Sequence, residues 1–374
     1  MSKQHSHFGW LVSPYSAKTR SYLLYKEVSF SDIEPNVIQL FRTIKGAVGR
    51  VIMPTVRLSH GQWLQDSSVI IDHFESETDA PSVHPPGHGQ RVASYLLEAF
   101  ADEWLPMAAL HYRWNIQENT RFAIQDFARS GIPFLPSWLG QKMVAPFADR
   151  MRGYLPVLGV DEGTIPAVEE TATITIRALN QQLEQTPYLL GGRPCLGDFA
   201  LYGPLWAHLY RDPGSRTLFD DAPHVRRWMD ALGNGAKAEG PFLPHDEVPE
   251  SLDTLFACIL EDQWAWIETL VKAIDAYCDA HPDAKRVPRA LGEADFMLRG
   301  RPGNNRKLVT FVQWKAQRAR QAYDAAGGAA DPWMRRVLGL DPDADVSGRI
   351  VPIRNPLVLR DFKPVLATDS ASET

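Results

Sequence analysis

The sequence has few cysteines, no long apolar run and no strong excess of one charge. Its cysteines, Cys195, Cys258 and Cys278, lie far apart and without metal-ligand spacing, which argues against a disulfide framework and against a zinc site. No stretch approaches about 18 uninterrupted apolar residues, so no membrane-spanning helix is predicted. The first residues lack the apolar run of a secretory signal. We therefore expect a reduced, cytoplasmic protein without a bound metal.

The charge balance argues against a polyanionic partner such as a nucleic acid. The 39 basic and 45 acidic residues give a formal net charge of −6, which does not favour a polyanionic partner for the chain as a whole. A hydrophobic content of 44% and a charged content of 22% are ordinary for a globular enzyme. At 374 residues the chain is long enough for two or three domains, each with its own core.

Strand-like and helical patterns alternate through the first 75 residues. Strands are expected at 7–12, 28–33, 51–58 and 61–64, and helices at 17–25, 37–43 and 67–74. This order, β-α-β-α-β-β-α, predicts a thioredoxin-like domain over residues 1–78. A polar, proline-rich linker follows it at 76–88.

Helical periodicity dominates the rest of the chain. We expect an all-helical domain over residues 89–240, with helices at 91–128, 165–186, 197–210 and 222–233. No element is predicted for the irregular segment 131–166. Residues 250–374 are predicted to form an extension that packs on the helical domain, with a helix at 251–280, a hairpin around 300–305, a helix at 311–326 and a loosely structured end. The predicted fold class is therefore α+β.

The run Ser13-Pro14-Tyr15-Ser16 lies where the first strand gives way to the first helix. Free backbone N–H groups at a helix N-terminus favour negative charge, such as that of a thiolate. Serine at both ends of this run provides no redox dithiol, but the Ser13 hydroxyl can donate a hydrogen bond to a thiolate brought by a ligand. Such a bond contributes about 1.5–3 kcal/mol, and one pKa unit corresponds to about 1.4 kcal/mol. The alternative role of Ser13 is a simple helix cap.

Two further motifs follow in the same domain. Pro54 interrupts a strand pattern, which indicates an edge, a bulge or a cis peptide bond that would leave the backbone of Met53 free for a peptide-like ligand. Asp66 and Ser67 open a helix, where the acid can bind an ammonium and the hydroxyl and helix N-terminus a carboxylate. The alternative for this pair is an ordinary N-cap.

In this order and spacing, the three motifs resemble the N-terminal domain of glutathione transferases. The resemblance implies that Ser13 activates the glutathione thiol, that Met53 before a cis Pro54 pairs with the cysteinyl backbone, and that Asp66 and Ser67 hold the γ-glutamyl end. It also implies a basic or amide contact to the glycyl carboxylate, for which Arg50 and Lys45 are the candidates.

The resemblance covers about residues 7–235. It continues in the second domain at a segment that opens a helix, where the family has a small polar cap followed three residues later by Asp198. This sequence departs from the family by placing Cys195 at the cap, and a thiol is a poorer acceptor than a hydroxyl.

An apolar stripe on the first long helix of the second domain indicates a place for a second substrate. It consists of Phe100, Trp104, Met107, His111 and Trp114. We predict that Tyr15, Trp104, Met107 and His111 line a pocket for a hydrophobic electrophile, because aromatic side chains with polar tips suit an aromatic substrate. The alternatives are core packing or a dimer interface.

The extension carries a local excess of positive charge. Residues 285–320 contain ten Lys or Arg and two acidic residues, which gives 10 − 2 = +8 against −6 for the chain. Nucleic-acid binding is one interpretation. We favour instead a solvated face that pairs with the acidic remainder of the protein, because aromatic residues are sparse among these charges.

These patterns together predict a glutathione-dependent transferase that adds an activated glutathione thiolate to a hydrophobic electrophile. Conjugation, isomerisation and dehalogenation are not distinguished, because all three use the same thiolate. Glutathione is the expected co-substrate and a homodimer the expected assembly, without a nucleic-acid or membrane partner. The alternative function is a non-catalytic scaffold or adaptor with the same fold.

Overall fold

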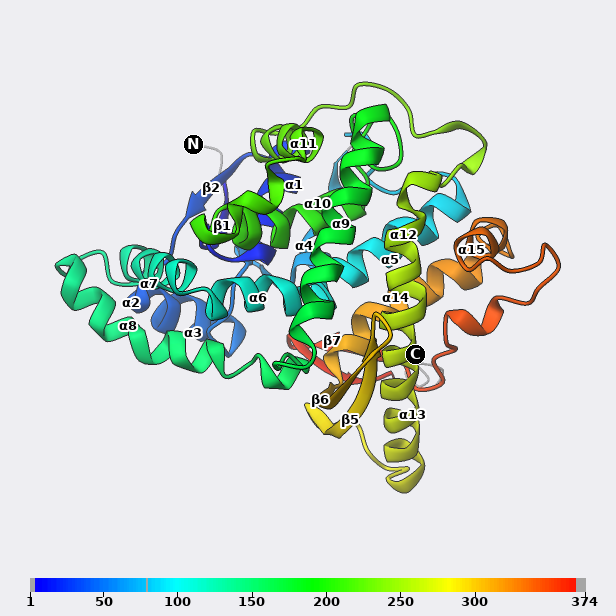
Figure 1. Cartoon of the computed structure of the whole chain (residues 1–374). Helices are drawn as coiled ribbons and strands as arrows, with labels where there is room; N and C mark the ends of the chain where they lie inside the picture. The colour runs from blue at the N-terminus through cyan, green and yellow to red at the C-terminus, as the bar shows by residue number, and fades with distance from the viewer. Residues whose placement is uncertain (1–3, 79, 368–374) are drawn as a thin grey trace.

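The computed structural model describes residues 4–78 and 80–367. Its N-terminal sheet contains the strands β1 (His5–Phe8), β2 (Phe30–Ile33), β3 (Thr55–Arg57) and β4 (Trp63–Gln65). The strands lie in the order β2-β1-β3-β4, with β1 and β2 parallel and the other neighbours antiparallel. Figure 1 shows this sheet at the N-terminal end of the chain, in blue.

Helices join the strands in the predicted order. They are α1 (Pro14–Tyr25), the short α2 (Val37–Gln39) and α3 (Lys45–Val48) with a π-helical turn between them, and α4 (Ser67–Glu77). Proline at the first position of α1 suits a helix start, because its fixed φ matches the helix and its missing N–H would be unpaired there in any case. The thioredoxin-like fold of this domain is confirmed. The Met53–Pro54 peptide bond is cis, as predicted.

The second domain is helical, as expected, but its first part is divided. The predicted helix 91–128 consists of three helices, α5 (His88–Glu103), α6 (Pro106–Asn115) and α7 (Gln117–Gly131). The first break falls before Pro106, which has no N–H to continue the helical hydrogen bonds. The second falls at Ile116, whose backbone is extended.

The remaining helices of this domain follow the predicted pattern more closely. They are α9 (Ile165–Gln185), α10 (Leu196–Pro204) with a π-helical continuation to Tyr210, and α11 (Pro223–Gly233). The segment 131–166, for which no element was predicted, contains α8 (Ser137–Arg152). At the start of α10, the carboxylate of Asp198 accepts a hydrogen bond from the Cys195 N–H at 2.9 Å, so the helix-opening box forms despite the cysteine.

The extension begins with a continuous helical run. It comprises α12 (Asp253–Ala257), a π-helical turn and α13 (Trp264–Ala280), in agreement with the predicted helix 251–280. The hairpin of β5 (Ala290–Leu298) and β6 (Arg301–Val309) follows, and then α14 (Phe311–Ala325) and α15 (Asp331–Val337). The end of the chain was expected to be loosely structured, but it contains a second hairpin, β7 (Leu357–Arg360) and β8 (Lys363–Leu366).

Helix α14 connects the extension to the rest of the molecule. It packs against α5, and Figure 1 shows the two helices side by side near the centre of the molecule. Most of the large apolar residues of α12 and α13 are buried, among them Phe256, Trp264 and Trp266. Within the residues that the structure describes, no helix combines the length and apolarity needed to cross a membrane.

Candidate functional site

Ser13 is the N-cap of α1. Its backbone is extended, and its Oγ accepts a hydrogen bond from the Ser16 N–H at 3.3 Å. Because Oγ acts there as an acceptor, the hydroxyl proton stays free to be donated. Ser13 is half-buried. The residue can therefore cap the helix and also donate a hydrogen bond to a ligand.

The loop in front of Ser13 is held by a buried arginine that the sequence analysis did not single out. The guanidinium of Arg113, on α6, donates to the Val12 carbonyl at 3.0 Å and to the Ala207 carbonyl at 2.7 Å. It also donates two hydrogen bonds of 2.7 Å to the carboxylate of Asp212. Arg113 is only 2% exposed. In the sequence, the sign of this role is that Arg113 is a charged residue within an otherwise mostly apolar run of α6.

His208 contacts the same carbonyl group. Its Nε2 lies 3.2 Å from the Val12 oxygen. Burial, and next the charge of Arg113, hold the pKa of His208 well below its ordinary value. His208 is therefore neutral, and the Val12 carbonyl has two donors directed at it. These contacts fix the backbone that presents Ser13.

The backbone of Met53 is open. Met53 is half-buried, and within residues 4–78 and 80–367 neither its N–H nor its C=O forms a hydrogen bond. Strand pairing begins two residues later, at Thr55, which lies opposite Phe8 of β1. The free donor and acceptor of Met53 therefore remain for a peptide-like ligand.

Asp66 already has partners within the chain. As the N-cap of α4, its Oδ1 accepts a hydrogen bond from the Ser68 N–H at 2.8 Å. The same oxygen lies 3.1 Å from Nζ of Lys315, which comes from α14 in the extension. Ser67 next to it is 2% exposed. A lysine of this chain thus contacts the carboxylate that was predicted to bind a ligand ammonium.

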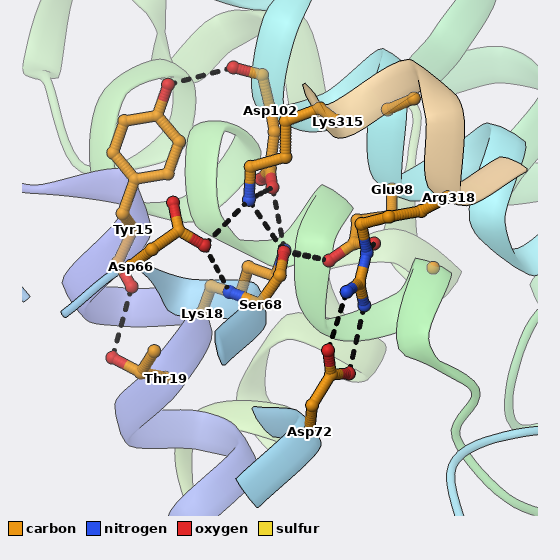
Figure 2. A network of polar contacts seen from close by, with 12 residues as sticks. Tyr15, Lys18, Thr19, Asp66, Ser68, Asp72, Glu98, Asp102, Lys315 and Arg318 are labelled. Atoms are coloured by element: carbon orange, nitrogen blue, oxygen red, sulfur yellow. Dashed lines mark hydrogen bonds and ion pairs between the residues drawn. The ribbon is translucent and has the colours of Figure 1, made fainter. Parts of the chain in front are cut away.

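Lys315 belongs to a buried ionic cluster that joins four helices (Figure 2). Its Nζ lies 2.6 Å from Ser68 Oγ and 3.0 Å from the Asp102 carboxylate. Lys18 of α1 pairs with Glu98 and with Asp102, both of α5, at 2.8 Å. We call this set of residues the ionic cluster: Lys18, Asp66, Ser68, Asp72, Glu98, Asp102, Lys315 and Arg318.

Arg318 closes the cluster on the outer side. Its guanidinium donates to both carboxylate oxygens of Asp72, at 2.6 and 2.9 Å, and to Glu98 at 3.1 Å. The cluster therefore contains three cations and four carboxylates, a net charge of −1. Burial opposes the ionisation of Glu98, but the charges of Lys18, Arg318 and Lys315 outweigh it and hold the Glu98 pKa well below its usual range. Glu98 is therefore ionised at neutral pH.

Tyr15 is fixed by a hydrogen bond to the same helix. Its hydroxyl donates to the Asp102 carbonyl at 2.8 Å. Burial, with the nearby charges of Glu103, Asp102 and Asp66, raises the Tyr15 pKa well above its ordinary value. Tyr15 thus keeps its proton and directs it to the Asp102 carbonyl. Of the two hydroxyl groups of Ser13 and Tyr15, only that of Ser13 therefore has a proton free for a ligand.

Arg50 is bound by the second hairpin of the extension. Its guanidinium donates to the side-chain oxygen of Gln65 at 2.6 Å and to the carbonyl oxygen of Phe362, between β7 and β8. Its Nε is buried without a hydrogen-bond partner. No carboxylate of the described residues forms an ion pair with Arg50.

The predicted electrophile pocket lies partly under the β5–β6 hairpin. The guanidinium of Arg306 stacks on Trp104 at 4.2 Å from the ring centroid, and its Nη1 lies 3.1 Å from the sulfur of Met107. Trp104 and Met107 are only 1% and 2% exposed. His111 lies further along α6, where its ring contacts Glu169 at 3.1 Å. The structure therefore brings Trp104 and Met107 together in packed surroundings, and pairs His111 with an acid of α9.

Glu103 is a carboxyl group that the sequence analysis did not select. It is half-buried at the end of α5, and none of the ion pairs within the described residues includes it. Burial raises the Glu103 pKa to about 8; Asp102 and Asp66 add to the rise, while Lys315 and Arg306 oppose it. At neutral pH this side chain is mostly a protonated acid, next to the ionic cluster.

The stability of the protein is expected to fall as the pH rises through the Glu103 transition. The folded state keeps the Glu103 proton up to a pKa of about 8, whereas the unfolded chain loses it near the ordinary value of 4.5. The stabilisation is therefore complete below about pH 4.5 and is lost by about pH 8. With an allowance for partial exposure, we expect Glu103→Gln to gain about 2 kcal/mol relative to the natural protein between pH 5 and pH 9.

Urea unfolding at pH 5, 7 and 9 measures this difference. Glu184→Gln, an exposed glutamate on α9, is the matched control and should show no pH-dependent gain. A constant difference between Glu103→Gln and the natural protein at all three pH values would contradict the prediction.

The described residues contain no group of three or more His, Cys, Asp or Glu side chains that suits a metal ion. In the ionic cluster, where carboxylates are most concentrated, lysine and arginine supply the positive charge.

Comparisons with known proteins match two segments of this chain to one family. The family model of the glutathione S-transferase N-terminal domain matches residues 8–82, and that of the C-terminal domain matches residues 162–231. A search of curated proteins gave no match.

Several solved structures are similar to this chain at low identity. FzlA from C. crescentus is 15% identical, with 61% of this chain and 87% of that chain covered and a TM-score of 0.40. The beta-etherase LigF from Sphingobium is 16% identical, with 62% of this chain and 95% of that chain covered and a TM-score of 0.41. A glutathione S-transferase from Methylobacillus flagellatus with glutathione bound is 17% identical, with 63% of this chain and 100% of that chain covered and a TM-score of 0.39.

The two family models cover the domain that carries Ser13, Met53 and Asp66 and residues 162–231 of the helical domain. This chain belongs to the glutathione transferase superfamily.

Proposed function

We propose that the protein is a transferase that binds glutathione and adds its thiolate to a hydrophobic electrophile. One observation carries the proposal: Ser13 has a free hydroxyl proton at the N-terminus of α1, in the same domain as the unpaired backbone of Met53. The hydroxyl and the helix end both favour a thiolate over a thiol. Such a site lowers the thiol pKa and makes the sulfur a nucleophile at neutral pH.

In the proposed reaction, the thiol proton leaves to solvent and the thiolate stays hydrogen-bonded to Ser13. The sulfur then forms a bond to an electrophilic carbon, and either a leaving group departs with its electron pair or an addition product takes up a proton. Met53 and Pro54 would align the cysteinyl backbone, Arg50 the glycyl carboxylate, and Asp66 and Ser67 the γ-glutamyl end. Conjugation, isomerisation and dehalogenation all fit this step.

The electrophile pocket also remains a proposal. Tyr15, Trp104, Met107 and His111 are its proposed lining, with the Arg306 side chain lying over Trp104 and Met107. A cytoplasmic homodimer belongs to the same proposal, and sedimentation of the purified protein tests the assembly.

A non-catalytic scaffold is the second candidate function. The observation in its favour is that the extension contacts both Asp66, through Lys315, and Arg50, through Phe362. Calorimetric titration distinguishes the two functions. A scaffold is expected to bind no thiol peptide, whereas a transferase is expected to bind one and to lower its thiol pKa.

Replacing Ser13 by alanine is expected to lower kcat about 10- to 150-fold, which corresponds to the loss of about 1.5–3 kcal/mol. The KM for the thiol should change little, because the hydroxyl acts on the thiolate and not on the rest of the ligand. Steady-state kinetics with an aromatic electrophile and the ultraviolet absorbance of the bound thiolate measure the two effects.

Ser13→Thr is the matched control, since threonine keeps both the hydroxyl and the cap. It should retain most of the activity and show a bound thiolate. If Ser13→Ala stays within twofold of the natural enzyme, Ser13 does not activate the thiol.

A further inference from the structure

The γ-glutamyl end of the proposed site contains an ammonium group of the protein itself. Nζ of Lys315 is surrounded by three oxygens, those of Asp66 at 3.1 Å, Ser68 at 2.6 Å and Asp102 at 3.0 Å (Figure 2). The Lys315 side chain is only 2% exposed. A primary ammonium has three protons, and here three acceptors lie around it. Lys315 is thus a fully partnered buried cation at the carboxylate that a ligand ammonium would need.

We infer that Lys315 takes the place of the ligand's α-ammonium, so that the protein selects a thiol peptide without an amino group at this end. The inference rests on the proposed function and specifies its thiol substrate. A second ammonium at Asp66 would lie close to that of Lys315, and the two like charges would repel each other. A deaminated ligand, which keeps the carboxylate of this end but has no ammonium, avoids this repulsion.

The charge of the ionic cluster supports this assignment. With Lys315 the cluster contains three cations and four carboxylates, and without it two cations and four carboxylates. A ligand ammonium would be needed only in the second case. Because Lys315 is part of the chain, it already supplies the positive charge that a ligand ammonium would otherwise bring to the cluster.

Arg50, the residue proposed for the glycyl carboxylate, has the reverse property. Arg50 donates to an amide oxygen and a carbonyl oxygen, and its buried Nε has no partner. No carboxylate of the described residues lies within ion-pair distance of it, so the ligand carboxylate proposed for Arg50 has an available cation. The ligand that fits both contacts is a cysteinyl peptide with a free glycyl carboxylate and, at the other end, an acyl chain that has a carboxylate but no ammonium.

Displacement of the extension by glutathione is the competing possibility. Lys315 and Arg318 lie on the same helix, and together they pair with Asp66, Asp102, Asp72 and Glu98. Moving α14 away would break all of these pairs at once and leave buried carboxylates without counter-charge. The geometry therefore favours selection of the ligand over movement of the helix.

A comparison of two thiols on the full-length protein tests the inference. Glutaryl-cysteinylglycine differs from glutathione only in lacking the α-amino group. We expect calorimetry to show that it binds at least tenfold more tightly than glutathione. Equal affinity, or a preference for glutathione, overturns the inference and leaves the proposed function standing. If neither thiol binds, the proposed function fails, and the inference fails with it.

The variant Lys315→Ala tests the same point from the protein side. It leaves Asp66 and Asp102 without this cation and opens space for a ligand ammonium, so the preference should reverse to at least tenfold in favour of glutathione. Glutathione should also raise the unfolding temperature of Lys315→Ala more than that of the natural protein, because the bound ammonium restores the missing charge.

Two further variants serve as controls. Lys315→Arg keeps the positive charge and should keep the preference for the deaminated thiol. Lys272→Ala removes an exposed lysine that, among the described residues, pairs only with Glu268 on its own helix, and it should change neither affinity. An unchanged preference in a folded Lys315→Ala protein overturns the inference. If that variant does not fold, the comparison of the two thiols on the natural protein still decides.

Discussion

Arg113→Met is expected to lower the free energy of unfolding by about 3–5 kcal/mol. The substitution removes a buried cation and leaves the carboxylate of Asp212 and two carbonyl oxygens without their donors. Methionine fills a similar volume, so the loss reflects unpaired polar groups and not a cavity. Urea unfolding monitored by circular dichroism measures the change.

Arg113→Lys should be nearly as damaging. A lysine ammonium cannot reproduce the planar fork that contacts Asp212, Val12 and Ala207 together. Arg121→Met, an exposed arginine on α7, is the matched control and should lie within about 0.5 kcal/mol of the natural protein. A loss below 1 kcal/mol for Arg113→Met would show that these hydrogen bonds do not hold the loop before Ser13.

Deleting residues 250–374 is expected to have a larger effect and to prevent stable folding. The deletion removes Lys315 and Arg318, so Lys18 remains as the only cation of the ionic cluster beside four carboxylates. Breaking one buried pair costs about 3–5 kcal/mol, and a domain of this kind has about 5–15 kcal/mol in total. Solubility, circular dichroism and hydrogen exchange of the truncated chain measure the outcome.

A compensated truncation separates charge from packing. Glu98→Gln and Asp102→Asn in the truncated chain remove two of the unpaired carboxylates and should recover part of the lost stability. If the uncompensated chain 1–249 is soluble and unfolds at the same urea concentration as the full-length protein, the extension does not stabilise the first two domains.

Much of the fold could be predicted because its signals are local. The alternation of the first 75 residues and the helical stripe of 251–280 both depend on neighbours a few positions away. The prediction of one helix over 91–128 was wrong. The apolar stripe continues past Pro106, but the helix cannot, because proline has no N–H to continue the backbone hydrogen bonds. Helix α8 was missed because Trp138, Met143 and Phe147 are exposed and Pro146 lies within it, so no stripe faces a core.

The candidate site was less predictable because its contacts join distant segments. The motifs at Ser13, Met53 and Asp66 are visible in the sequence, whereas the pairing of Lys315 with Asp66 spans 249 residues. The positive excess of 285–320 was interpreted as a solvated face. Lys315 and Arg318 do pair with acidic residues, but Lys315 is buried, because α14 lies against α5 and not toward solvent.

The ionic cluster has a consequence for biosynthesis. Asp66, Glu98 and Asp102 emerge from the ribosome more than 200 residues before Lys315 and Arg318, which at about 5–20 residues per second corresponds to roughly 10–50 s. Throughout that interval the nascent N-terminal domain has Lys18 as its only cation of the cluster. In a multidomain chain the N-terminal domain generally folds first. In this protein the N-terminal domain can begin to fold first, but its charged residues reach their final pairing only after the segment with Lys315 and Arg318 has been made.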